Sequence, residues 1–264
     1  MSDVYAELTE LGVATVFEAS GRRGLVDIDL ERIVPGTRAA GPARTVRCGE
    51  GDNLMVHAAL AGAQPGDVLV LTRPVPAPVA MVGDLLVTQA LVRGVAALLV
   101  DGAVRDVDEL RELGLPVWAR YIRARGPDKN VVGAVDEPVV VGGATIRAGD
   151  VVVLDADGAV VVERERLEEV LASARQRDAD EREKRAKLQA GALSYDLDGL
   201  RARVEAPRPD LRGGAGRTGY HSFTRTRVAQ YRSERRKRVT RRHRRRSRKS
   251  SPPDERRRTS QPPL

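Results

Sequence analysis

The sequence predicts an α/β domain in which helices cover a sheet of buried strands. Two short apolar runs, residues 68–71 and 96–100, have the length and continuity of strands that are buried on both faces of a sheet. Residues 84–93 and 107–113 have the composition of helices, and the second carries acidic residues in its first turn. This alternation of strand and helix along the chain is typical of an α/β core.

Ahead of this alternation, the sequence predicts a helix, a half-buried strand and a second helix. The first helix spans 4–20, where apolar residues recur at helical spacing. The strand spans 43–48, where apolar and polar residues alternate. The second helix follows the turn at 49–53, and either Asp52 or Asn53 caps it.

Beyond Pro116 the pattern changes to short β-rich pieces, which glycine-containing turns separate. The pieces expected as strands are 117–121, 131–135, 139–141, 144–146, 151–154 and 159–162. Residues 164–190 then predict a charge-laced C-terminal helix with few apolar positions. Such a helix is an exposed arm or a surface that packs on another subunit, and we favour the subunit contact.

Charge divides the chain into a domain over 1–206 and a tail over 207–264. The tail has 20 Lys and Arg against 4 Asp and Glu, whereas the domain has a net charge of −8. Because the tail has too few apolar residues to offset the entropy lost on folding, we predict that it is disordered. As a functional segment it would bind nucleic acid with salt-dependent affinity; the alternative is read-through of a GC-rich gene in an altered frame.

The remaining composition favours a cytoplasmic protein. A single cysteine, Cys48, excludes a framework of internal disulfides, and its apolar surroundings predict a small core residue. Residues 1–7 lack the basic region and apolar run of a signal peptide. No stretch approaches the roughly 18 apolar residues of a membrane span, so we expect no membrane contact.

A candidate binding site begins where the helix over 84–93 starts. Gly83 lets the backbone approach a ligand closely, because glycine has no side chain. The helix that follows leaves the amides of Leu85 and Leu86 unpaired, and these amides are suited to receive a carboxylate. Asp84 would then accept hydrogen bonds from metal-bound waters.

Arg105 and Asp106 follow the second buried strand, and ligands of open α/β sheets bind at the carboxyl ends of strands. A hard divalent cation prefers oxygen ligands and keeps several waters, while a neighbouring guanidinium can hold an anion beside it. The alternative is that Asp84 and Asp106 are ordinary helix caps and that Arg105 pairs with Asp108 or Glu109.

The motif formed by these residues resembles that of a known family. Gly83-Asp84, the twenty residues between Asp84 and Arg105, and Arg105-Asp106 are similar to the Gly-Asp/Glu-x20-Arg-Asp signature of the RraA-like class II pyruvate aldolases. The resemblance runs from about Leu11 to Val204. It includes segments 15–19, 51–57, 100–106, 155–158 and 193–197. The chain departs from the family's pattern at Glu163, where proline is usual, and in the basic tail.

The resemblance implies a layered β/β/α fold of the swivelling type and a metal-dependent carbon-carbon lyase. Asp106 would bind Mg²⁺ or Mn²⁺, Asp84 would hold the metal's waters, and Arg105 would face the substrate. The reaction implied is retro-aldol cleavage of 4-carboxy-4-hydroxy-2-oxoadipate or 4-hydroxy-4-methyl-2-oxoglutarate to pyruvate, in the breakdown of aromatic compounds. Decarboxylation of oxaloacetate is the second activity implied.

The resemblance also implies trimers or hexamers with active sites at subunit clefts. A glutamate from the C-terminal helix of a neighbouring subunit would approach the metal's waters. Glu181 is the position that aligns with it, Glu183 is a rival, and the alternative is a solvated acidic helix face. Asn53 and His57 would line the rim of the substrate pocket, although a lone histidine near an apolar helix is more often structural.

Three other functions are also compatible with the sequence. The regulatory branch of the same fold binds and inhibits an RNA-degrading endonuclease, but in that branch the carboxylate after the arginine is replaced, whereas this chain keeps Asp106. A nucleic-acid binder would act through the basic tail, with the domain as a passive carrier. Methyl transfer is the third, and the sequence has no glycine loop for the cofactor of that class.

Overall fold

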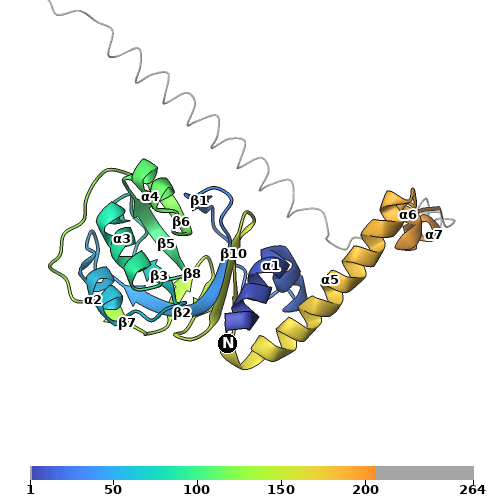
Figure 1. The fold of residues 1–264 in the computed structure, drawn as a ribbon, viewed down its shortest axis with the longest axis horizontal. Coiled ribbons are helices and arrows are strands. Elements are labelled where there is room, and N and C mark those ends of the chain that lie inside the picture. The colour runs from blue at the N-terminus through green and yellow to red at the C-terminus, as the bar shows by residue number, and fades with distance from the viewer. Residues whose placement is uncertain (1, 206–264) are drawn as a thin grey trace, which may run out of the picture. The chain divides into compact units, whose positions relative to one another are not determined.

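The computed structural model describes residues 2–205, and residues up to Asp198 form one compact unit (Figure 1). A second unit starts at Gly199, and the helix α7 is the element described in it. The strands are β1 (Glu31–Arg32), β2 (Ala39–Arg47), β3 (Val68–Thr72), β4 (Ala80–Val82), β5 (Ala97–Val104), β6 (Val117–Ile122), β7 (Ala134–Val135), β8 (Val139–Val141), β9 (Ala144–Ile146), β10 (Val151–Asp155) and β11 (Gly158–Val162). The helices are α1 (Ser2–Ala19), α2 (Leu54–Gly62), α3 (Asp84–Val92), α4 (Val107–Leu113), the 3-10 turn η1 (Arg164–Arg166), α5 (Leu167–Gln189), α6 (Ser194–Leu197) and α7 (Leu200–Glu205). The tail predicted over 207–264 lies outside the described residues.

The main sheet has the strand order β1-β6-β5-β3-β2-β10-β11, with β4 paired to β5 and β7 paired to β2. Parallel pairing joins β2, β3, β5 and β6, because a helix connects each of these strands to the next. The α/β alternation predicted from the sequence is therefore confirmed. The strands β10 and β11 form an antiparallel hairpin, which is the β-rich layer that the sequence predicted.

The sheet nearly closes on itself. The start of β2 pairs with β10, and residues 43–47 pair with β3, so this one strand joins the two halves. Leu25 forms an isolated β-bridge with Val160 of β11. The strand β1, which follows a few residues later, pairs with β6. The segment between Leu25 and Arg32 therefore connects the two edges, and the result is a barrel-like sheet with helices outside it (Figure 1).

Apolar side chains pack in three clusters around this sheet. One lies between the sheet and α2, α3 and α4, and a second fills the interior of the nearly closed sheet. Trp118 is the largest side chain of the interior, and its indole Nε1 donates a hydrogen bond of 2.9 Å to the carbonyl oxygen of Asp155. The third cluster packs α1 and the start of α5 against β10 and β11.

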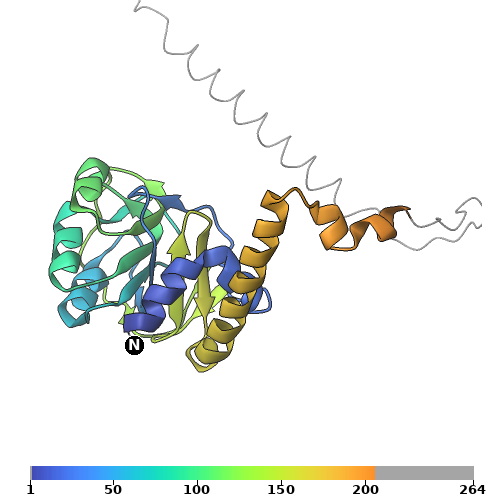
Figure 2. The ribbon, with the colours of Figure 1, turned by 45° about the vertical axis from the view of Figure 1, so that its right-hand side comes forward.

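The helix α5 leaves the body of the domain after its first turns (Figure 2). Its buried residues are Val170, Leu171 and Ala174, all in the half that packs against the domain. The rest of the helix is polar and carries i,i+4 ion pairs, as the charge pattern predicted. Among residues 2–205, no helix combines the length and hydrophobicity that crossing a membrane requires.

Three details of the predicted elements were wrong. The strand expected over 43–48 begins earlier and spans Ala39–Arg47. The strand expected over 131–135 is present only at Ala134–Val135, because the amides of Asn130 and Val131 donate hydrogen bonds to the Asp52 carboxylate instead. The strand expected over 96–100 is longer and reaches Val104.

Candidate active site

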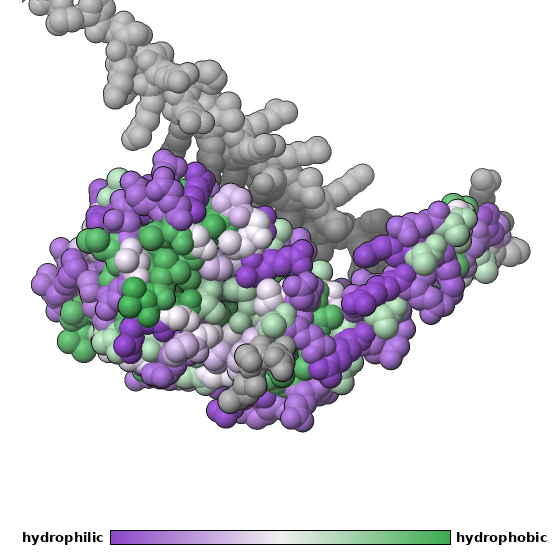
Figure 3. Space-filling view, viewed as in Figure 1, coloured by the Kyte–Doolittle hydropathy of each residue, from purple (hydrophilic) through white to green (hydrophobic). Residues whose placement is uncertain are grey.

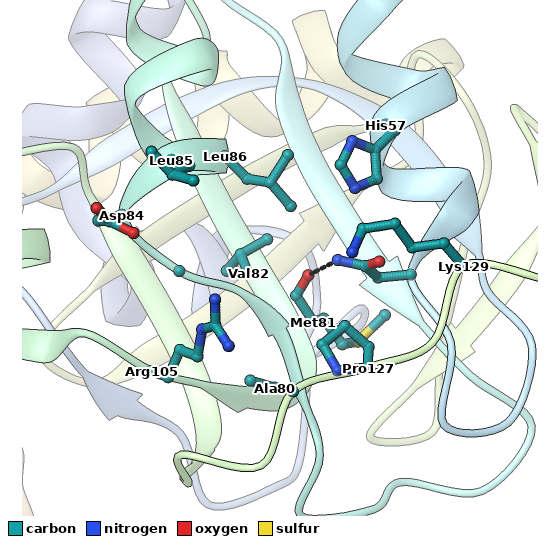
Figure 4. Close-up of a pocket in the computed structure, with 13 residues that line it drawn as sticks. His57, Ala80, Met81, Val82, Asp84, Leu85, Leu86, Arg105, Pro127 and Lys129 are labelled. Carbon is teal, nitrogen blue, oxygen red and sulfur yellow. Dashed lines mark hydrogen bonds between the residues drawn. The ribbon is translucent and has the colours of Figure 1, made fainter.

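A cavity of about 190 Å³ lies where β2, β4 and β5 end (Figure 4). The residues that follow these three strands meet there, because the carboxyl ends of parallel strands share one edge of a sheet. Ala80, Met81 and Val82 form an apolar wall, and the first turn of α3 forms another. Polar groups occupy the two opposite sides of the cavity.

The Asp106 side chain is held in place by the Asp84 amide and by Arg105. The backbone of Asp106 is left-handed, with φ 56° and ψ 45°, which aspartate tolerates better than most residues. Its Oδ2 atom accepts hydrogen bonds from the Asp84 amide at 3.4 Å and from Nε of Arg105 at 3.2 Å. A Cβ atom added at Gly83 would lie only 2.3 Å from this oxygen, so the approach requires glycine. Oδ1 has no hydrogen-bond donor among the described residues.

The first turn of α3 presents backbone amides to the cavity. Gly83 is the N-cap and provides no side-chain cap, and the Asp84 amide is engaged by Asp106. The amides of Leu85 and Leu86 follow, and first-turn amides have no carbonyl partner within the helix. Both residues line the cavity, so this helix start is suited to a carboxylate.

Arg105 lies on the same side of the cavity as Asp84 (Figure 4). Only its Nε atom contacts Asp106, and the side chain is partly exposed. A Cβ atom at Gly126 would lie 3.1 Å from Nη1, so the loop backbone passes close beside the guanidinium. Nη1 and Nη2 have no carboxylate partner within residues 2–205, and they are free to bind an anion.

Asn53 and His57 lie across the cavity from Arg105, and both line it. Asn53 occupies the N-cap position of α2, but its side chain makes no capping hydrogen bond. The carboxylate of Asp52, one residue earlier, accepts a hydrogen bond of 2.7 Å from the Leu54 amide. The Asn53 side chain instead donates from Nδ2 to the carbonyl oxygen of Met81 at 2.8 Å, which Figure 4 shows as a dashed line.

Lys129, which was not predicted from the sequence, also lines the cavity. It lies in the loop between β6 and β7, where no periodic pattern or motif marks it. Backbone hydrogen bonds from Asn53 to Asp128 and from Asp128 to Gly51 attach this loop to the segment before α2. Asp52 attaches it further, because its Oδ2 atom accepts hydrogen bonds from the two amides that follow Lys129.

We expect Asp52→Ala to lower the free energy of unfolding by about 3 kcal/mol at pH 7, because three backbone amides lose a charged acceptor in a fully buried position. Burial by itself raises the pKa of Asp52, but the amides and Lys129 outweigh it and lower the pKa overall. The stabilisation is therefore present above the unfolded pKa of about 3.9 and is lost as the pH falls through the folded pKa.

Urea unfolding of the wild type and of Asp52→Ala at pH 7 and pH 3 measures this. The difference between the two proteins should shrink in acid. Glu109→Ala is the control, because Glu109 is exposed on α4 and its loss should cost little at either pH. If Asp52→Ala lowers the free energy of unfolding by the same amount at both pH values, the ionised carboxylate of Asp52 is not the source of the stabilisation.

Arg73, Asp101 and Cys48 interact electrostatically and form a second polar cluster. Arg73 is almost fully buried, and its three side-chain nitrogens have no hydrogen-bond partner among the described residues. Asp101 pairs with Arg120 at 3.0 Å. Burial raises the pKa of the neighbouring Cys48 thiol to about 11, so this thiol stays protonated at neutral pH and is a poor nucleophile. The prediction that Cys48 is a small core residue is confirmed.

Glu181 is not brought to this cavity within one chain. It lies on the polar part of α5, where it forms an ion pair of 2.9 Å with Arg177. Glu183 pairs with Lys187 on the same helix. The cavity is on the side of the domain that carries α2 and α3, whereas α5 packs against α1 (Figure 1). Either glutamate can therefore reach a cavity of this kind only in a neighbouring subunit.

The fold and the site together define a class of small α/β proteins with a nearly closed sheet and, at its strand ends, a cavity lined by an arginine, a lysine and the first turn of a helix. The profile of the RraA-like family, described as aldolase/RraA, matches residues 7–161. The chain belongs to the RraA-like family.

Individual relatives agree with this assignment. A Halalkalibacterium halodurans protein with a provisional 4-hydroxy-4-methyl-2-oxoglutarate aldolase name is 35% identical over 168 residues, which is 64% of this chain and 78% of that protein. A crystal structure of an uncharacterized Pseudomonas syringae protein has a TM-score of 0.64 at 27% identity, covering 73% of this chain and 95% of that one. A Streptomyces coelicolor structure has a TM-score of 0.63 at 32% identity, covering 70% and 96%, and is described as an unusual member of the RNase ES inhibitor RraA family.

Proposed function

We propose that this protein is a divalent-metal-dependent aldolase that cleaves a 4-hydroxy-2-oxo dicarboxylic or tricarboxylic acid to pyruvate and also decarboxylates oxaloacetate. The observation that carries the proposal is that Arg105 and the first turn of α3 line one cavity, and that Asp106 lies directly behind them, bonded to the Asp84 amide and to Nε of Arg105. The aldolase name of the Halalkalibacterium halodurans relative supports it.

The donor set fits Mg²⁺ or Mn²⁺. One oxygen of Asp106 is held by two donors, and the other has no protein donor among residues 2–205. No three acidic, histidine or cysteine side chains of those residues gather into a complete ligand set. This suits a hard cation that keeps most of its waters and takes one or two carboxylates from the protein, with Asp84 holding the waters.

The chain's own groups account for the remaining steps. When bound, the metal would polarise the keto group of the substrate as a Lewis acid. The amides of Leu85 and Leu86 hold the carboxylate next to that keto group. As the C3–C4 bond breaks, its electron pair forms the pyruvate enolate, and the hydroxyl at C4 gives its proton to a base and becomes a carbonyl. Protonation of the enolate at C3 by water then gives pyruvate. Arg105 stabilises the negative charge that develops on the former keto oxygen. With oxaloacetate, the same bond cleavage releases carbon dioxide.

The proposal includes a trimer or hexamer in which Glu181, or its rival Glu183, comes from a neighbouring subunit. Exposed apolar side chains of α3 support a contact beside the cavity: Leu85 is 75% exposed and Val92 is 82% exposed. Figure 3 shows hydrophobic residues gathered over this face. A monomeric soluble protein rarely exposes such a cluster, and a second subunit would cover it.

The test is pyruvate release from oxaloacetate by the metal-stripped protein, with and without added Mg²⁺ or Mn²⁺. We expect metal to restore turnover at least about 100-fold above that of the same concentration of free metal, which is modest against typical enzymatic accelerations. The free metal without protein is the control. Turnover no faster than this control overturns the proposal.

That negative outcome would favour a second candidate, a regulator without catalytic activity that binds an RNA-degrading endonuclease. The observation in its favour is the RNase ES inhibitor family description of the Streptomyces coelicolor structure. The retention of Asp106 beside Arg105 favours the enzyme, because a protein that acts by surface binding alone has no need of a carboxylate held in this geometry.

A further inference from the structure

The side of the cavity opposite Arg105 carries polar groups that the proposed cleavage has not yet used. These are Asn53 and His57, from the start of α2, and Lys129, from the loop after β6. Figure 4 shows the side chains of Arg105 and Lys129 extending from opposite sides toward the space between them. A ligand that fills the cavity would therefore contact a cation at each end.

The orientation of the Asn53 amide shows what kind of group it would bind. The carbonyl oxygen of Met81 can only accept a hydrogen bond, so the NH₂ group of Asn53 must face it. The other atom, Oδ1, is buried and has no partner among the described residues, and the residue is only 4% exposed. A buried acceptor left unpaired is energetically unfavourable, so this position favours a ligand that donates a hydrogen bond, such as a hydroxyl.

His57 lies one helical turn after Asn53, so the two side chains are neighbours on one face of α2. Its Nε2 atom is also buried without a partner among the described residues. An imidazole nitrogen can take a proton from a hydroxyl that is hydrogen-bonded beside it. Both residues line the cavity, and each has one buried side-chain atom without a partner among the described residues.

Lys129 adds a positive charge to this wall. No carboxylate of residues 2–205 lies within ion-pair distance of its ammonium group, although it acts on Asp52 over a longer range. The two amides bound to Asp52 hold the backbone just after Lys129. The lysine is therefore placed at the cavity while its charge remains available to an anion.

We propose that Asn53, His57 and Lys129 form the subsite for the substituents at C4 of the substrate, and so decide which 4-hydroxy-2-oxo acids are cleaved. This inference rests on the proposed aldolase function. The C4 hydroxyl donates a hydrogen bond to Oδ1 of Asn53, and Nε2 of His57 takes its proton as the C3–C4 bond breaks and the C4 carbonyl forms. The distal carboxylate pairs with Lys129.

The first test compares two substrates in His57→Phe, which keeps a ring of similar size and removes both nitrogens. Cleavage of 4-hydroxy-4-methyl-2-oxoglutarate should lose about 100-fold in kcat, the usual contribution of a positioned proton acceptor. Oxaloacetate has no hydroxyl at C4, so its decarboxylation should fall at least tenfold less. Asn53→Leu should shift the ratio of kcat/KM values in the same direction. A misfolded variant would lower both activities together, so the ratio is the readout.

The second test uses Lys129→Met, an exposed loop position where the fold is expected to survive. KM for 4-hydroxy-4-methyl-2-oxoglutarate should rise about tenfold, as for the loss of a charge-assisted hydrogen bond. KM for 4-hydroxy-2-oxopentanoate, which has no distal carboxylate, should not change. Arg125→Met is the matched control, because it removes the same charge from an exposed position on this loop outside the cavity lining.

The outcomes separate the two proposals. A wild-type protein that turns over neither substrate overturns the aldolase function itself. A second outcome is that the wild type cleaves both substrates, the His57 and Asn53 variants lower both activities equally, and Lys129→Met leaves KM unchanged. That outcome overturns the subsite and leaves the aldolase function in place.

Discussion

Asp106→Asn is expected to lower metal-dependent pyruvate release at least about a thousandfold while the protein remains folded. In the proposed site Asp106 would bind the metal, whose Lewis acidity would stabilise the developing charge by several kcal/mol. Each 1.36 kcal/mol corresponds to a factor of ten in rate. Asparagine is the suitable replacement, because it tolerates the left-handed backbone found at this position, with φ 56°. The loss should therefore come from the site and not from strain.

Pyruvate release from oxaloacetate at saturating Mg²⁺ measures this effect, and titration of Mn²⁺ binding gives an independent readout. Asp108→Asn is the matched control, because it removes the same charge two residues further along the chain from a carboxylate that is 91% exposed. The control should keep wild-type activity and wild-type Mn²⁺ affinity. If Asp106→Asn kept both, Asp106 would not be the metal ligand.

Gly83→Ala should lower activity about 100-fold, although it adds only one methyl group. The new Cβ atom would lie 2.3 Å from Oδ2 of Asp106 and 3.0 Å from Nε of Arg105, so both side chains must move. Oδ2 must retreat by about 1 Å to reach a normal contact, and a displacement of that size typically costs about two orders of magnitude in rate. Gly83 has φ −141°, which alanine adopts freely, so backbone strain does not contribute.

The measurement is kcat/KM for oxaloacetate together with the thermal midpoint of unfolding. The midpoint should change little, because Arg105 and Asp106 are partly exposed and can move into solvent. Gly62→Ala is the control, since its Cβ atom would meet only the end of the Arg44 side chain. Wild-type activity in Gly83→Ala would show that the close approach of Gly83 to Asp106 has no role in the reaction.

Much of the fold is predictable from local pattern. Residues 68–71 and 96–100 are continuous apolar runs, and they form β3 and β5 at the centre of the sheet, where both faces are covered. The charge pattern over 164–190 likewise predicts α5. The short strands β1 and β4 escaped prediction. The strand β1 is a polar pair of residues, and β4 follows a segment with prolines at positions 74, 76 and 78, so neither displays a strand pattern.

The residues of the candidate site likewise include some that the sequence predicts and one that it does not. Gly83, Asp84, Arg105 and Asp106 were named from the sequence, because each adjoins the start of a helix or the end of a strand. Lys129 was not, since its loop has no periodicity and reaches the cavity only through hydrogen bonds to residues 51–53, far away along the chain. The sequence also left open whether Asp52 or Asn53 caps α2. In the structure Asn53 is the N-cap residue but its side chain bonds to Met81, while the Asp52 carboxylate accepts a hydrogen bond from the first amide of the helix.

The sequence by itself determined the α/β alternation, the RraA-like motif and the identity of the groups that could bind a metal and an anion. These features depend on residues close together in the chain, or on a spacing that a motif preserves. Only the tertiary structure decided that Gly83 lies against Asp106, that Oδ1 of Asn53 is left without a partner, and that Lys129 faces Arg105 across the cavity. Each of these depends on the packing of segments distant in sequence, and no local pattern encodes how such segments meet.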